Sequence, residues 1–166
     1  MTFSLNGFGR SPQKSQGCES KEPVEARMSI DVFEKHFLEI ARHFFLAFSR
    51  PQSQAWVDAF WKAEQAFPMP FGATIAHAIL ISINELRSLR TRPFAFQNPY
   101  CTHCSTDITN EERYLLLALR SVRLGNKSQA STNALLLCEN EDTSAFLESL
   151  ERLSIITGDI DDPTYS

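Results

Sequence analysis

The chain has 166 residues, a formal net charge of −4, 43% hydrophobic residues and 22% charged residues. This length suits one domain with a buried core, and this composition is ordinary for a globular protein. The six glycines are few for a turn-rich all-β protein. No apolar run reaches the roughly 18 residues that a membrane-spanning helix requires.

Residues 1–27 lack apolar periodicity and are rich in serine, glycine, glutamine and charged side chains. We interpret them as a flexible leader that precedes a helical domain. The leader has no basic stretch followed by an apolar block, so we expect no signal peptide. The four cysteines are then expected in a reducing compartment, and we assign the protein to the cytoplasm.

The first predicted helix begins near Asp31, whose carboxylate can form a capping box with Glu34. Its apolar residues recur with the 3.6-residue period of a helix. Thirteen phenylalanines in the chain, several at this spacing, predict an aromatic-rich core. The predicted inner stripe of this helix is Phe33, Phe37, Ile40, Ala41, Phe44 and Phe48.

A turn at residues 49–52 separates the first helix from the second, and Ser49 and Gln52 have capping-box spacing there. The second helix runs to about Phe67, because the prolines at 68 and 70 end it. We predict that its inner face carries Trp56, Phe60, Ala63 and Phe67.

The third predicted helix, residues 72–89, has apolar residues on most of its faces, which predicts a central position in the bundle. Residues 91–108 then form a loop. The fourth helix follows a Thr109–Glu112 capping box and stops at Gly125. The fifth helix is predicted to be capped by Ser128.

A sixth helix is predicted to open at Asp142 or Thr143. The sequence therefore predicts an all-α fold of about six helices in a compact bundle, with a cysteine-containing loop between helices three and four. The predicted boundaries are the leader at 1–27, a single helical domain at 28–157 and an acidic tail at 158–166.

The loop contains Cys101-Thr102-His103-Cys104, a CxxC pair that can supply half of a tetrahedral zinc site. No second pair of this kind exists, so the remaining ligands would come singly. The alternatives are a redox-active or regulatory dithiol, or cysteines with no chemical role. The candidate further ligands are His103, Cys138, His77, Cys18 and a carboxylate such as Asp107.

Two of these candidates also have a simpler interpretation. Cys138 lies on the apolar side of the fifth helix, where a buried cysteine behaves as a small hydrophobic residue. His77 lies in the central helix, where a buried, neutral, hydrogen-bonded histidine is the favoured interpretation. His36 and His43 are seven residues apart on the first helix and are expected at the solvated rim.

A DNA-binding regulator is the main alternative function. Residues 85–138 carry seven lysines and arginines against four acids, and the turn at 125–127 is compatible with a helix-turn-helix. One observation argues against DNA binding. In residues 128–138, the apolar run from Ala134 to Leu137 occupies positions where a recognition helix needs polar, base-reading side chains. The following residues, 139–166, carry eight acids against one arginine. Nucleic-acid binding is therefore disfavoured.

A catalytic signature is not evident, since the chain lacks a GxSxG elbow, a phosphate loop and an HExxH motif. We therefore expect a cytoplasmic binding or regulatory protein that acts through a protein partner, with zinc at the CxxC loop. A thiol- or metal-dependent sensor or enzyme is a further alternative. The first two helices carry more large apolar side chains than one buried stripe on each helix can hold. This excess predicts a homodimer. These residues are Leu38, Phe45, Leu46, Val57 and Trp61.

Overall fold

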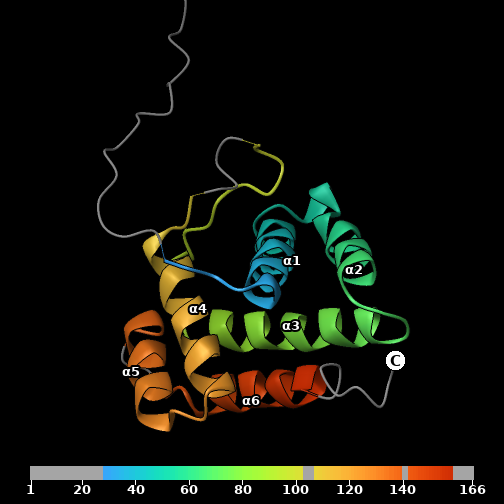
Figure 1. The fold of residues 1–166 in the computed structure, drawn as a ribbon. Coiled ribbons are helices and arrows are strands. Elements are labelled where there is room, and N and C mark those ends of the chain that lie inside the picture. Colours follow the sequence, from blue (N-terminus) through green and yellow to red (C-terminus); the bar gives the residue numbers. More distant parts are fainter. Residues whose placement is uncertain (1–27, 103–106, 140–141, 159–166) are drawn as a thin grey trace, which may run out of the picture.

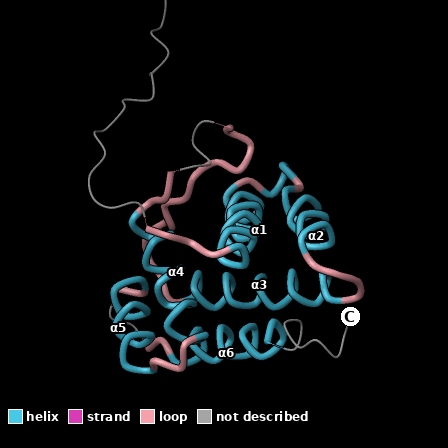
Figure 2. Tube along the Cα trace, in the orientation of Figure 1, coloured by secondary structure: helices cyan, strands magenta, loops and turns pink. Residues whose placement is uncertain are grey.

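The computed structural model describes residues 28–102, 107–139 and 142–158 of the chain. All regular structure in these ranges is helical, as Figures 1 and 2 show, and the predicted all-α fold of six helices is confirmed. The elements are α1 (Val32–Ser49), a short 3₁₀ helix η1 (Pro51–Ser53), α2 (Ala55–Ala66), α3 (Phe71–Ser88), α4 (Asn110–Arg123), α5 (Lys127–Leu137) and α6 (Ser144–Gly158).

Helix α3 is central in the bundle, as its apolar pattern predicted. It contacts α1 and α2 on one side and lies along α6 on the other, while α4 and α5 form a hairpin that packs against α6 (Figure 1). The cysteine-containing segment between α3 and α4 extends beside α1. A search of the described helices for a stretch with the length and hydropathy of a bilayer span finds none.

Side-chain caps define the starts of α1, α4 and α5. Both predicted capping boxes form: the Asp31 carboxylate accepts from the Glu34 N–H at 2.7 Å, and the Thr109 hydroxyl accepts from the Glu112 N–H at 3.1 Å. The predicted cap of α5 was wrong, because Asn126, two residues before Ser128, accepts from the Gln129 N–H.

The predicted capping box at residues 49–52 is also wrong. Ser49 is the last residue of α1, where its hydroxyl donates to the Leu46 carbonyl at 3.0 Å, and η1 starts after Arg50 without a side-chain cap. The chain instead makes the one-turn helix η1 and then passes through Gln54 in the left-handed conformation, with φ of 51°. Helix α2 consequently begins only at Ala55.

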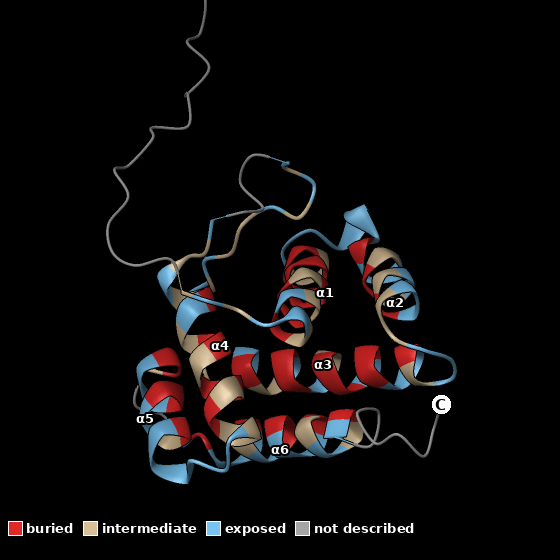
Figure 3. Cartoon of the chain, viewed as in Figure 1, coloured by how far each residue is buried: buried red, intermediate tan, exposed pale blue. Residues whose placement is uncertain are grey.

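The core is rich in aromatic and branched aliphatic residues, and it runs through all six helices (Figure 3). Fully buried side chains recur at helical spacing on α1 and α3, as their sequence stripes predicted. The largest of these side chains are Phe37, Phe44, Ile40, Ile75, Ile79, Ile83 and Leu86.

The inner face of α2 differs from the prediction at Trp56, whereas Ala63 is buried and Phe60 and Phe67 pack against the core as predicted. Its buried residues are Ala55, Ala59 and Ala63, whereas Trp56 remains 53% exposed. Small side chains allow the α2 and α3 backbones to approach closely: a Cβ added at Gly72 would lie 2.6 Å from the Glu64 Cα. The alanines therefore face inward because the helices pack too closely for a tryptophan between them.

The surplus apolar residues of α1 are buried within one protomer. Leu38, Phe45 and Leu46 are all buried, and the ring of Phe45 stacks on Phe94 with centroids 4.0 Å apart. Residues from the segment after α3 therefore cover the part of α1 that the homodimer hypothesis assigned to a second copy. That part of the hypothesis is wrong, and only the outer side of α2 stays uncovered.

The predicted leader at 1–27 lies outside the described residues. The predicted acidic tail lies outside them as well, apart from Gly158, which is the last residue of α6. The described part of the predicted domain forms one core.

Candidate functional site

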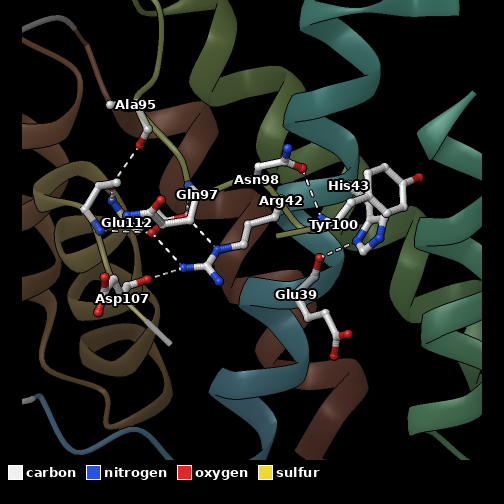
Figure 4. Close-up of polar contacts among 10 residues, drawn as sticks. Glu39, Arg42, His43, Ala95, Gln97, Asn98, Tyr100, Asp107 and Glu112 are labelled. Carbon is white, nitrogen blue, oxygen red and sulfur yellow. Dashed lines mark hydrogen bonds and ion pairs between the residues drawn. The ribbon is translucent and has the colours of Figure 1, made fainter. Parts of the chain in front are cut away.

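The segment between α3 and α4 is anchored to the bundle by a buried ion pair (Figure 4). The Arg42 guanidinium of α1 donates to the Glu112 carboxylate of α4 at 2.7 and 3.0 Å, and both side chains are buried. Arg42 also donates to the Asp107 carbonyl at 2.6 Å. Glu112 further accepts from the backbone N–H groups of Gln97 and Thr109. The middle of the segment, at Gln97, and its C-terminal end, at Asp107 and Thr109, are thus held by one pair of charges.

The approach to the CxxC motif is a hydrogen-bonded turn. The Cys101 N–H donates to the Asn98 carbonyl at 3.0 Å, and the Asn98 side chain accepts from the Tyr100 N–H at 3.0 Å. Pro99 between them has the fixed φ that suits the second position of such a turn. The turn presents Cys101 in a half-buried position.

Tyr100 connects this turn to α1 and α2. Its ring stands edge-on to His43 of α1, with centroids 5.4 Å apart (Figure 4), and its hydroxyl donates to the Asp58 carboxylate of α2. The hydrogen bond to Asp58 raises the pKa of Tyr100 to about 12. The loop is therefore docked beside α2 before the CxxC pair begins.

His43 is buried, in contrast to the rim position that the sequence predicted. Its Nδ1 lies 2.8 Å from the Glu39 carbonyl, which can only accept, so Nδ1 carries the proton in this hydrogen bond. The burial arises because Tyr100, from a segment distant in sequence, lies over the ring. The helical period of the α1 sequence cannot predict a contact with a segment that is distant in sequence.

The predicted metal ligands are not gathered into a site within the described residues. His103, Cys104 and Cys18 lie outside them. Arg42 donates to the backbone carbonyl of Asp107 and not to its carboxylate. In the described ranges, three His, Cys, Asp or Glu side chains nowhere come close enough together to hold a metal ion.

Cys138 and His77 lie away from the CxxC turn. Cys138 is buried at the C-terminal end of α5, and burial raises the pKa of its thiol to about 11. This agrees with the interpretation of a buried hydrophobic cysteine. His77 is exposed, so the predicted buried histidine was wrong. It lies on the solvent-facing side of α3, together with Thr74 and Ile81.

The outer side of α2 and the neighbouring loop expose large apolar side chains. Trp56 is 53% exposed, Val57 45%, Trp61 55% and Tyr100 56%. We call Val57, Trp61 and Tyr100 the aromatic face; Trp56 lies about 140° from Trp61 around the axis of α2, at the far border of this face. Tyr100 belongs to it because its hydroxyl contacts Asp58, which is one helical turn before Trp61. The sequence pattern identified Val57 and Trp61 as surplus, but it placed Trp56 inside and did not identify Tyr100.

The cations that favoured DNA binding are largely paired within the protomer. Arg120 donates to Glu34 at 2.7 Å, Arg123 to Asp31 at 2.6 Å, and Arg92 to Glu139 at 2.9 Å. A phosphate backbone would have to compete with these carboxylates. The fifth helix also exposes the apolar side chains of Leu135 and Leu136, which cannot hydrogen-bond to base edges.

Comparisons of the chain with protein families, with characterised proteins and with solved structures found no match. The aromatic face, the loop beside it and the charges around them are therefore the features from which a function can be inferred.

Proposed function

We propose that the protein is a protein-interaction module and that the aromatic face is its binding surface. The observation that carries this proposal is that the two tryptophans of the chain, Trp56 and Trp61, both lie half exposed on one helix. Tryptophan and tyrosine are the residues that most often dominate binding energy at protein interfaces. A rigid helix also presents them with little loss of conformational entropy on binding.

The occupant that we propose for the aromatic face is a second copy of the chain. Of the charged groups at its border, the Lys62 ammonium lies 2.7 Å from the Glu39 carboxylate, whereas Asp58 accepts a hydrogen bond from Tyr100 and keeps its negative charge. Burial of the exposed apolar side chains of two such faces against each other would supply the favourable free energy. Closed two-fold dimers are also the commonest oligomers, and they require such a self-compatible surface.

Sedimentation velocity at micromolar concentration tests this proposal. We expect twice the mass of one chain for the wild type, and a single-chain mass for Trp61→Glu, because a carboxylate at the centre of the interface would be buried without a partner. Ile155→Glu is the matched control, since Ile155 is 67% exposed on α6 and lies outside the aromatic face. A wild type that sediments as a single chain at every concentration would reject self-association through this surface.

We also propose that Cys101 and Cys104 bind a structural zinc ion. The turn that is closed by the Asn98 carbonyl supports this, since it holds the first cysteine in a fixed, half-buried position. Zinc would then fix the loop beside α2 and stabilise Tyr100 within the aromatic face. His103 remains the nearest candidate in sequence for a third ligand. A reducing cytoplasm, which we propose as the location, would keep both thiols available for the metal.

A further inference from the structure

A second surface feature lies away from the aromatic face, at the C-terminal ends of α1 and α3. There the residues that follow α3 fold over Phe45 and Phe48 and leave a cavity of about 320 Å³. This volume lies at the lower end of the range for small-molecule pockets. Three arginines line the cavity, Arg87, Arg90 and Arg92, and its lining within the described residues contains no acidic side chain.

The positive charge of this cavity is only partly compensated. Arg92 donates to the Glu139 carboxylate at 2.9 Å, and the same carboxylate lies 3.7 Å from Arg90. Glu111 lies further from Arg90, at 4.0 Å. For Arg87, no ion-pair partner occurs in the part of the chain that the structure describes; its guanidinium lies over the Phe48 ring, 3.7 Å from the centroid.

Arg90 has an unused hydrogen-bond donor. Its side chain is only 7% exposed, and one of its terminal nitrogens donates to the Leu137 carbonyl at the end of α5. Its Nε is buried and has no acceptor among the described residues. Buried donors in folded proteins are nearly always paired, so an unpaired one in a cavity wall suggests a missing acceptor.

The remaining wall of the cavity is aromatic. The rings of Phe45 and Phe94 stack with centroids 4.0 Å apart, and Phe96 stacks on the other part of Phe45 with centroids 5.7 Å apart. The planar guanidinium of arginine can donate to two oxygens of a carboxylate, sulfonate or phosphate group at once, while phenylalanine rings favour flat apolar surfaces. The two halves of the cavity therefore select different halves of one ligand.

From these contacts we propose that the cavity binds a small organic anion, with a flat apolar body against the phenylalanines and its acidic group between Arg87 and Arg90. The acidic group would supply the acceptor that Arg90 Nε lacks and the counter-charge that Arg87 lacks. This site is independent of the aromatic face, because it shares no residue with it.

A fluorescence titration with anilinonaphthalene sulfonate, a flat aromatic anion, tests the site on the full chain. We expect saturable binding of one dye per chain. Its neutral analogue, N-phenylnaphthylamine, and inorganic phosphate alone should each bind at least roughly tenfold more weakly, since each lacks one half of the ligand. Arg87→Gln should weaken dye binding by roughly tenfold, because it removes the uncompensated charge.

Arg113→Gln is the matched control, since Arg113 is an exposed helical arginine that lies outside the cavity. It should bind the dye as the wild type does. In a ¹H–¹⁵N spectrum, the Arg90 Nε–H signal should shift on saturation with the dye. The proposal is overturned if the dye does not bind, if the neutral analogue binds equally well, or if Arg87→Gln leaves the affinity unchanged. It is also overturned if dye binding is lost in Trp61→Glu instead, which would place the dye on the aromatic face.

Discussion

The bidentate pair between Arg42 of α1 and Glu112 of α4 has a counterpart at the other end of the same two helices, where Glu34 of α1 accepts from Arg120 of α4. In both pairs the glutamate is the third residue of a helix that begins with a capping box. Each glutamate therefore caps its own helix and binds an arginine of the other. Because the two pairs lie at opposite ends, they fix the register of α1 against α4.

Loss of one partner in the Arg42–Glu112 pair should destabilise the fold strongly. In Glu112→Gln the capping group is retained, but the buried guanidinium loses its counter-charge. We expect a loss of about 3 kcal/mol in the free energy of unfolding, measured by urea titration. Lys62→Met, which breaks the half-exposed pair with Glu39, should cost at most about 1 kcal/mol. Equal losses in the two variants would contradict this account.

Gly72 should be intolerant of substitution, because α3 passes so close to the backbone of α2. A Cβ at this position would lie 2.6 Å from the Glu64 Cα, and neither backbone can move without repacking the core. We expect Gly72→Ala to lower the stability by about 1–3 kcal/mol. At Gly158 an added Cβ meets no atom within 4 Å, so Gly158→Ala should change stability by no more than about 0.5 kcal/mol. Thermal unfolding of both variants checks the difference.

The buried thiol of Cys138 should make the fold sensitive to alkaline pH. The pKa of this thiol rises from 9.0 to about 11 on folding, because burial disfavours the thiolate. The folded state then holds its proton more tightly than the unfolded state. The resulting stability is fully present below pH 9.0 and is lost as the pH rises towards about 11.

We expect this loss to be about 1–2 kcal/mol. The measurement is the free energy of unfolding from pH 8 to 11 for the wild type and for Cys138→Ala, in which the thiol is absent. The difference between the two proteins should shrink as the pH rises. A difference that stays constant with pH would show that this thiol does not titrate with folding.

The zinc proposal predicts close to one equivalent of zinc per chain in protein that is purified without an affinity tag. Cys101→Ser with Cys104→Ser should release the metal and lower the melting temperature, since structural zinc contributes directly to folding. Cys138→Ala should retain the zinc, because Cys138 is buried at the end of α5. Wild-type protein that elemental analysis shows to be metal-free, and that takes up no added zinc, would sink the proposal.

The helices and two of their caps were predictable because these signals are local. Asp31 with Glu34 and Thr109 with Glu112 are three residues apart, and the apolar stripe of α1 follows from the helical period. The arginines that bind these glutamates could not be predicted. Each is more than 60 residues away in sequence, and only the packing of α1 against α4 brings them together.

The site was less predictable than the fold for the same reason. Trp56 was placed inside because size and spacing suggested it, whereas close helix packing selected the alanines one residue earlier in each turn. His43 was placed at the rim, since its cover by Tyr100 depends on how a long loop folds back. The tertiary contacts of that loop also bury Phe45, which therefore cannot serve a dimer.

The most direct test of the central claim uses the position of the two tryptophans as reporters. Trp56 and Trp61 are the only tryptophans of the chain; Trp61 lies in the aromatic face and Trp56 at its border, so their quenching by acrylamide reports on the exposure of the outer side of α2. We expect the quenching constant of the wild type to fall as the protein concentration rises through the micromolar range. In Val57→Glu, which retains both tryptophans, the constant should stay high at every concentration. A wild-type constant that is independent of concentration and equal to that of Val57→Glu would contradict the proposed interface.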